Sequence, residues 1–272
     1  MSPNIKQSNA FNSLIKAVLF CVVFTLLLVG VFFLKSMFPV LPERWAHGVL
    51  GTFAALLVTW LFLKFNKAGF ASIGFTASLS TIKNFFTGLL AGILIMGALT
   101  IIVIYTSGFS IAINSKSNFL HFILLSSPLI LLAYMEEVAF RGYPLQLLKQ
   151  NFSLRSSLLI TSLLFALYHI ANGWSVQSSL LGPGPWGIIF GLAALYGNGI
   201  SMATGLHYGV NLTTAAFAIN DSAHNLWILK QGNGQSLENY QSSSLETLLP
   251  ELASIIVAVI LMEWYLRKRH RQ

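Results

Sequence analysis

The sequence predicts an all-α, polytopic integral membrane protein, built as one bundle of about eight transmembrane helices. Of its 272 residues, 55% are hydrophobic and only 9% are charged, and the mean hydropathy is +0.72. Soluble domains carry about 25% charged residues, so this chain lacks the polar surface that water requires. Its apolar runs are long and do not alternate with polar residues, which favours helices over a transmembrane barrel.

Eight apolar runs are candidates for spans, each of which needs about 20 residues. The first is too long for the apolar core of a signal peptide, and no small-residue cleavage site follows it. The sixth and seventh are short and separated by Gly197-Asn198-Gly199, a strong turn signal. The segment 174–181 is expected to be a surface or re-entrant piece. The expected spans are residues 14–35, 45–63, 85–105, 119–140, 156–172, 186–198, 200–219 and 252–266.

The basic residues give an independent test of this topology. With a cytoplasmic N-terminus, eleven of them lie inside and four outside, and Arg141 lies at a helix end, as the positive-inside rule requires. We therefore expect a multi-pass protein of the cell membrane with both termini in the cytoplasm. The inner residues are Lys6, Lys16, Lys64, Lys67, Lys83, Lys149, Arg155, Arg267, Lys268, Arg269 and Arg271, and the outer ones are Lys35, Arg44, Lys116 and Lys230.

This topology also predicts how the chain is divided into domain, loop and tail, and which partners it has. The whole chain, 1–272, is one membrane domain, residues 220–250 form an outward-facing polar loop, and 267–272 form a basic cytoplasmic tail. Membrane topology explains the net charge of +8 better than nucleic-acid binding, so the lipid bilayer is a partner and nucleic acid is not. Cys21 is the only cysteine, which excludes a disulfide framework or a thiolate metal cluster.

Glu136 and Glu137 are the most deeply placed acidic residues in the expected spans. Ionisable groups at membrane depth cost about 2.5–3.5 kcal/mol each on insertion scales, so they indicate a function. On a helix, Glu137 and Arg141 are four residues apart and can pair, whereas Glu136 points about 100° away. Glu136 is therefore not so directly neutralised by this arginine, which suits a group that shuttles protons. A plain ion pair at the helix end is the structural alternative.

Two further helices carry polar residues on one face. Phe165 and His169 are four residues apart near the end of the fifth expected span, and His207 and Asn211 have the same spacing in the seventh. Each histidine alone suits a packing role, but three polar faces on separate apolar helices favour one polar cavity. Glu136 and His169 reach the same level only if the fourth span continues past Pro144 to about residue 148, with the turn near 152–153.

The ordered set Glu-Glu-x-x-x-Arg (136–141), Phe-x-x-x-His (165–169) and His-x-x-x-Asn (207–211) resembles the signature of the CPBP family. These are the CAAX prenyl proteases and bacteriocin-processing or immunity (Abi) proteins, related to the Ras-converting CAAX protease. The resemblance covers residues 119–219 and implies an eight-helix bundle with a catalytic core there. It implies an intramembrane endopeptidase that acts on a membrane-associated peptide or a prenylated protein.

The residues suggest how such a hydrolase would work. Glu136 is the expected general base on water, with His169 helping to hold that water. His207 and Asn211 are placed to donate hydrogen bonds to the oxyanion. Glu137, Arg141 and Phe165 are supporting residues. No cofactor is expected.

Three alternatives stay open at this stage. The first is a zinc-dependent version of the protease with Glu136, His169 and His207 as ligands. The second is a non-catalytic bacteriocin-immunity or partner-binding membrane protein. The third is an ion-coupled transporter, against which no inverted repeat is visible.

Overall fold

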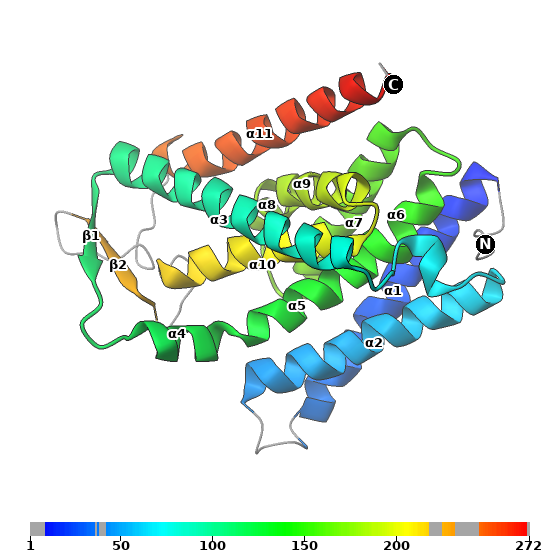
Figure 1. Ribbon diagram of the computed structural model, residues 1–272, viewed down its shortest axis with the longest axis horizontal. Coiled ribbons are helices and arrows are strands. Elements are labelled where there is room, and N and C mark those ends of the chain that lie inside the picture. The colour runs from blue at the N-terminus through cyan, green and yellow to red at the C-terminus, as the bar shows by residue number, and fades with distance from the viewer. Residues whose placement is uncertain (1–8, 36, 38–41, 218–224, 232–244, 271–272) are drawn as a thin grey trace.

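The computed structural model describes residues 9–35, 37, 42–217, 225–231 and 245–270 as a membrane helical bundle (Figure 1). Residues 1–8 and 271–272, and most of the expected polar loop at 220–250, lie outside these ranges. The helices are α1 (Ala10–Lys35), α2 (Glu43–Phe65), α3 (Leu79–Ser107), α4 (Phe119–Ser126), α5 (Pro128–Glu137), α6 (Tyr143–Leu148), α7 (Leu154–Ala171), α8 (Val176–Leu181), α9 (Pro183–Tyr196), α10 (Ile200–Ala216) and α11 (Leu245–His270). Two short turns, η1 (Phe70–Ile73) and η2 (Val138–Gly142), complete them.

Six helical segments in the described residues are long and apolar enough to cross a membrane. They match the first six expected spans, so the multi-pass membrane class is confirmed. The other two expected spans correspond to α10, which has 17 residues, and to α11. The total of eight spans and the side on which the termini lie stay predictions. In Figure 1, the start of α1 and the end of α11 lie at the same end of the bundle.

The fourth span runs from 119 to 148, as the shared cavity requires. It consists of α4, α5, η2 and α6, and η2 is a π-helical turn. The turn that follows ends at Ser153, whose hydroxyl accepts a hydrogen bond from the amide of Ser156 and so caps α7. The sixth span also starts earlier than expected. The segment predicted to be a surface or re-entrant piece contains α8, which forms part of the candidate span 176–196.

The all-α bundle also carries a short two-stranded antiparallel sheet, which the sequence did not predict. Strand β1 (Phe109–Ile113) pairs with β2 (Trp227–Gln231), with Ile111 opposite Leu229. The first strand comes directly after α3, and the second lies in the segment expected to be a polar loop. Asn114 extends the connection by donating its side-chain amide to the backbone oxygen of Asn225. The sheet lies at the end of the bundle opposite the start of α1 (Figure 1).

Helices α3 and α10 pack closely because glycines line both sides of their contact. A Cβ atom added to Gly205 would lie 2.0 Å from the carbonyl oxygen of Phe85, and one added to Gly88 would lie 2.1 Å from that of Met202. Gly205 and Gly209, four residues apart, form the α10 side of this contact. Without a hydrophobic force between helices in lipid, such small-residue contacts are a main source of association. They fix α10, which carries His207.

Replacing Gly205 with alanine should therefore destabilise the bundle by about 1–3 kcal/mol, because the backbones of α3 and α10 must separate. Thermal unfolding in detergent or lipid measures the effect as a lower melting temperature. Gly97→Ala is the matched control, since nothing lies within 4 Å of a Cβ at this position of α3. Alanine there should be neutral or stabilise by about 0.5–1 kcal/mol. Equal melting temperatures for the two variants would contradict the prediction.

Candidate active site

Glu137 and Arg141 form a fully buried ion pair. Nη1 of Arg141 lies 3.2 Å from Oε1 of Glu137, and both side chains have no solvent exposure. The pairing is the one that the four-residue spacing predicted. Nη2 of Arg141 also donates to the carbonyl oxygen of Gly187 at 3.1 Å, which ties η2 to the first turns of α9. The arginine therefore connects two helices as well as neutralising a carboxylate.

Aromatic rings surround the guanidinium of Arg141. Its carbon atom lies 4.3 Å from the ring centroid of Phe165 and 5.3 Å from that of Phe190. Such stacking stabilises a weakly hydrated cation by up to about 2 kcal/mol when water is excluded. Phe165 was predicted as a supporting residue, and it contacts the site through this ring.

His207 connects the two glutamates. Its Nδ1 lies 2.8 Å from Oε1 of Glu137, and its Nε2 lies 3.7 Å from Oε2 of Glu136. Because a carboxylate only accepts hydrogen bonds, Nδ1 carries a proton and donates it to Glu137. The imidazole is also stacked on Phe190, with ring centroids 4.2 Å apart. The stacking on one ring face and the hydrogen bond of Nδ1 hold the imidazole in one orientation, with Nε2 directed at Glu136.

Glu136 has a different environment from Glu137. Its side chain retains 15% exposure, against none for Glu137. In the described residues, its one hydrogen bond comes from the hydroxyl of Tyr168, which donates to Oε1 at 3.4 Å. No arginine or lysine pairs with it in those residues. Sequence reasoning missed Tyr168, because aromatic residues near helix ends are usually interface anchors. Its position next to His169 was the available signal.

His169 makes its hydrogen bond in the described residues to the backbone of its own helix. Its Nδ1 lies 2.9 Å from the backbone oxygen of Phe165 and donates to it, which leaves Nε2 as an acceptor. The Phe165 ring contacts both imidazoles, with centroids 4.6 Å from His169 and 6.1 Å from His207. Asn211 is half-buried one turn beyond His207 on α10. The described residues provide no hydrogen-bond partner for its side-chain amide.

The three ligands of the zinc alternative do not converge. Glu136 and His207 face each other, but His169 contacts neither of them in the described residues. Across those residues, no group of three histidine, cysteine, aspartate or glutamate side chains is arranged to hold a metal ion. A catalytic zinc needs three protein ligands around one point. In the described residues these three side chains therefore do not surround one point, and metal dependence stays a prediction.

Residues 116–213 match the family model described as "Type II CAAX prenyl endopeptidase Rce1-like". The match runs from just before α4 into α10 and contains all three motifs. These residues form an Rce1-like CAAX endopeptidase domain. The family confirms the predicted resemblance and implies a protease that acts on a protein substrate. No curated protein matches the chain. Within the Rce1-like domain, Glu136, Glu137 and His207 form a buried cluster consistent with the catalytic site of a protease.

Proposed function

We propose that this protein is an intramembrane endopeptidase that hydrolyses a peptide bond of a membrane-associated peptide or protein, with Glu136 as the general base. The contrast between the two adjacent carboxylates carries this proposal. Arg141 and His207 both bind Glu137, whereas Glu136 keeps one oxygen, Oε2, directed at Nε2 of His207 across 3.7 Å. One glutamate is thus a fixed anion, and the other is available for proton transfer.

The gap between Glu136 and His207 suits the attacking water. At 3.7 Å the two atoms are too far apart for a good direct hydrogen bond, and both are acceptors when the imidazole is neutral. A water beside them can donate one hydrogen to each and direct its lone pair at a substrate carbonyl. Glu136 removes one proton as the new C–O bond forms. The same proton then passes to the leaving nitrogen as the C–N bond breaks.

The remaining residues have roles that follow from their hydrogen bonds. The amide of Asn211 is the proposed oxyanion donor, a role worth about 2.7–4 kcal/mol in other hydrolases. His207 in its neutral form gives its one N–H to Glu137, so it can act as a second donor only after Nε2 gains a proton. His169 retains a free Nε2, and we propose that it helps to hold the water or relays the proton. No metal takes part in this scheme.

Tyr168 is a positioning residue in this scheme, because its hydroxyl holds the second oxygen of Glu136. Tyr168→Phe should lower kcat by about 10- to 150-fold and leave KM nearly unchanged, since a hydrogen bond to a charged group is worth about 1.5–3 kcal/mol. Steady-state kinetics on one peptide substrate measures both constants. Tyr208→Phe is the control, because Tyr208 packs against Phe85 on the α3 side of α10. An unchanged kcat for Tyr168→Phe would remove the tyrosine from the mechanism.

The proposed function is tested with purified protein reconstituted in lipid and a set of membrane-associated peptides, with and without a lipid anchor. Mass spectrometry identifies the products, and cleavage in ¹⁸O-labelled water should place one label in the new carboxyl group. Activity should persist in the presence of a zinc chelator. Loss of activity with chelator and recovery with added zinc would favour the metal-dependent version. Absence of cleavage for every peptide, with the protein folded, would favour a non-catalytic immunity or partner-binding role.

A further inference from the structure

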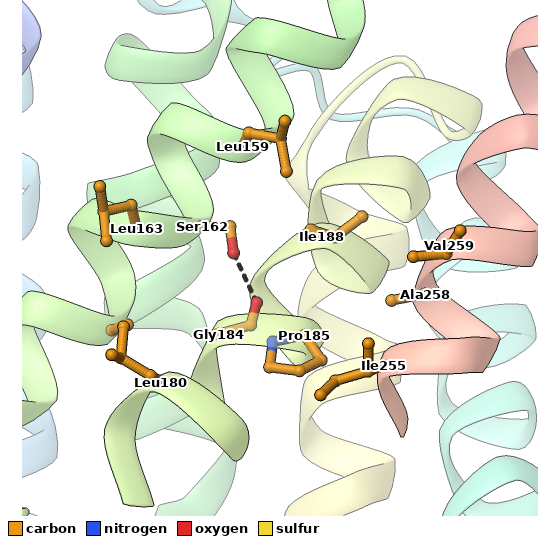
Figure 2. Close-up of a pocket in the computed structure, with 11 residues that line it drawn as sticks. Leu159, Ser162, Leu163, Leu180, Gly184, Pro185, Ile188, Ile255, Ala258 and Val259 are labelled. Carbon is orange, nitrogen blue, oxygen red and sulfur yellow. Dashed lines mark hydrogen bonds between the residues drawn. The ribbon is translucent and has the colours of Figure 1, made fainter. Parts of the chain in front are cut away.

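An apolar groove lies on the outside of the bundle between α7, the start of α9 and α11 (Figure 2). Its volume is about 260 Å³, just below the ~300–1,000 Å³ of most ligand pockets. Ser162 is the polar side chain in its wall, and its hydroxyl donates to the carbonyl oxygen of Gly184 at 2.5 Å. Since that hydroxyl is already bonded, the wall presents mainly hydrocarbon and suits a slender apolar chain.

The rims of the groove are exposed and apolar. Leu159 and Leu163 on α7 are 47% and 51% exposed, and Val259 on α11 is 46% exposed. Because α7 is a candidate membrane span, we expect its exposed leucines to face the hydrocarbon of the bilayer. The medium in contact with the groove is therefore made of acyl chains. On the far wall, Ile188 directly follows Gly187, whose carbonyl oxygen binds Arg141.

One end of the groove is basic. Arg155 precedes Leu159 by one turn of α7, and Glu263 follows Val259 by one turn of α11. Nη2 of Arg155 lies 2.7 Å and 3.0 Å from the two carboxylate oxygens of Glu263, so the two helices meet there. The next turn of α11 adds Arg267, which is exposed.

Lys268 follows Arg267 on α11 and is a third cation after Arg155 and Arg267. The Nζ atom of Lys268 lies 5.3 Å from the ring centroid of Trp264 and 5.7 Å from that of Tyr196. This end of α7 and α11 thus carries three cations, of which Arg155 is paired with the carboxylate of Glu263. Glu251, one turn before Ile255, places a carboxylate toward the other end. The charges distinguish the two ends of the groove and favour an anion at the basic one.

We propose that the groove binds one acyl chain of an anionic phospholipid from the bilayer, with the phosphate at Arg155, Arg267 and Lys268. Chain and headgroup are recognised by separate features, the apolar wall and the basic end. Interfacial lysines and arginines attract anionic lipid by about 1 kcal/mol each. The bound lipid lies against the part of α9 that anchors Arg141. This proposal concerns a lipid and does not depend on the proposed peptidase activity.

Native mass spectrometry tests the proposal on the full-length protein in mild detergent, incubated with equal amounts of phosphatidylglycerol and phosphatidylcholine that carry the same acyl chains. We expect the protein to retain one phosphatidylglycerol at least tenfold more often than phosphatidylcholine. Val259→Trp and Leu163→Trp, which fill the groove, should each lower this retention at least tenfold. Ile260→Trp is the matched control, because Ile260 is 60% exposed on the same helix and does not line the groove.

The headgroup is tested separately. Arg267→Gln should remove most of the preference for phosphatidylglycerol, and Lys67→Gln, an exposed cation after α2, should leave it unchanged. A phosphatidylglycerol with a photoreactive group in its acyl chain should crosslink the wild-type protein to peptides of α7, α9 or α11, which needs no variant. Equal retention of the two lipids, undiminished retention in the folded groove variants, or crosslinks only to other helices would each overturn the proposal.

Discussion

Glu136→Gln should lower kcat for peptide hydrolysis by about 10²–10⁴-fold, the usual contribution of a general base. Glutamine has the same shape, and its amide oxygen still accepts the hydrogen bond from Tyr168. It cannot take a proton from water at neutral pH. The fold should therefore stay intact, with a melting temperature close to that of the wild type. Single-turnover hydrolysis of a peptide in lipid measures the chemical step directly.

Glu137, the neighbouring carboxylate, provides a matched control for this prediction. Glu137→Gln removes the partner of Arg141, so it should lower the melting temperature as well as the rate. Glu43→Gln, at the exposed start of α2, should leave the rate of hydrolysis unchanged. Wild-type turnover by a folded Glu136→Gln variant would show that another group is the base. A melting temperature lowered equally by Glu136→Gln and Glu137→Gln would contradict the separation of their roles.

Arg141→Met should destabilise the protein by about 3–5 kcal/mol, because it leaves Glu137 buried without its cation. It also removes the donor to Gly187 and the cation stacked on Phe165. Arg141→Lys should recover only part of the loss. A lysine keeps the charge but lacks the planar set of donors that reaches both the carboxylate and the carbonyl oxygen. Thermal or chemical unfolding in detergent measures each effect.

A double-mutant cycle separates the ion pair from the packing. In Arg141→Met/Glu137→Gln no buried charge is left uncompensated, so the double variant should be more stable than Arg141→Met alone. The coupling energy should be about 0.5–3 kcal/mol. Additive effects would show that Arg141 stabilises the bundle through Gly187 and the rings and not through Glu137.

Hydropathy and residue spacing along the chain predicted the structural features that depend on a single helix. Hydropathy located the helical runs, and the four-residue spacing assigned Arg141 to Glu137. The need to bring Glu136 level with His169 predicted the longer fourth span. Strand β1 also had a local signal, since apolar side chains alternate in Phe109-Ser-Ile-Ala-Ile113. Its partner, β2, lies in a polar segment whose composition favoured a loop.

Hydropathy and spacing could not predict contacts between residues that lie on different helices. The packing of α10 beside α5 brings Nδ1 of His207 within 2.8 Å of Oε1 of Glu137, a contact that the sequence did not predict. The hydroxyl of Tyr168 reaches Glu136 because α7 returns beside the fourth span. Neither contact follows from spacing along a single helix. The catalytic roles of Glu136, His169, His207 and Asn211 stay predictions, and the variants above test the roles of Glu136 and its partners.

The π-helical turn at Val138–Gly142 changes which side chains share a face along the fourth span. A π turn holds one residue more than an α turn, and one residue corresponds to about 100° of rotation around a helix axis. The two halves of the fourth span are therefore out of phase by roughly that angle. A single periodic pattern laid over 119–148 would assign the wrong face to one half. A helical-wheel projection of this span therefore needs an offset of one position within 138–142, directly after Glu136 and Glu137.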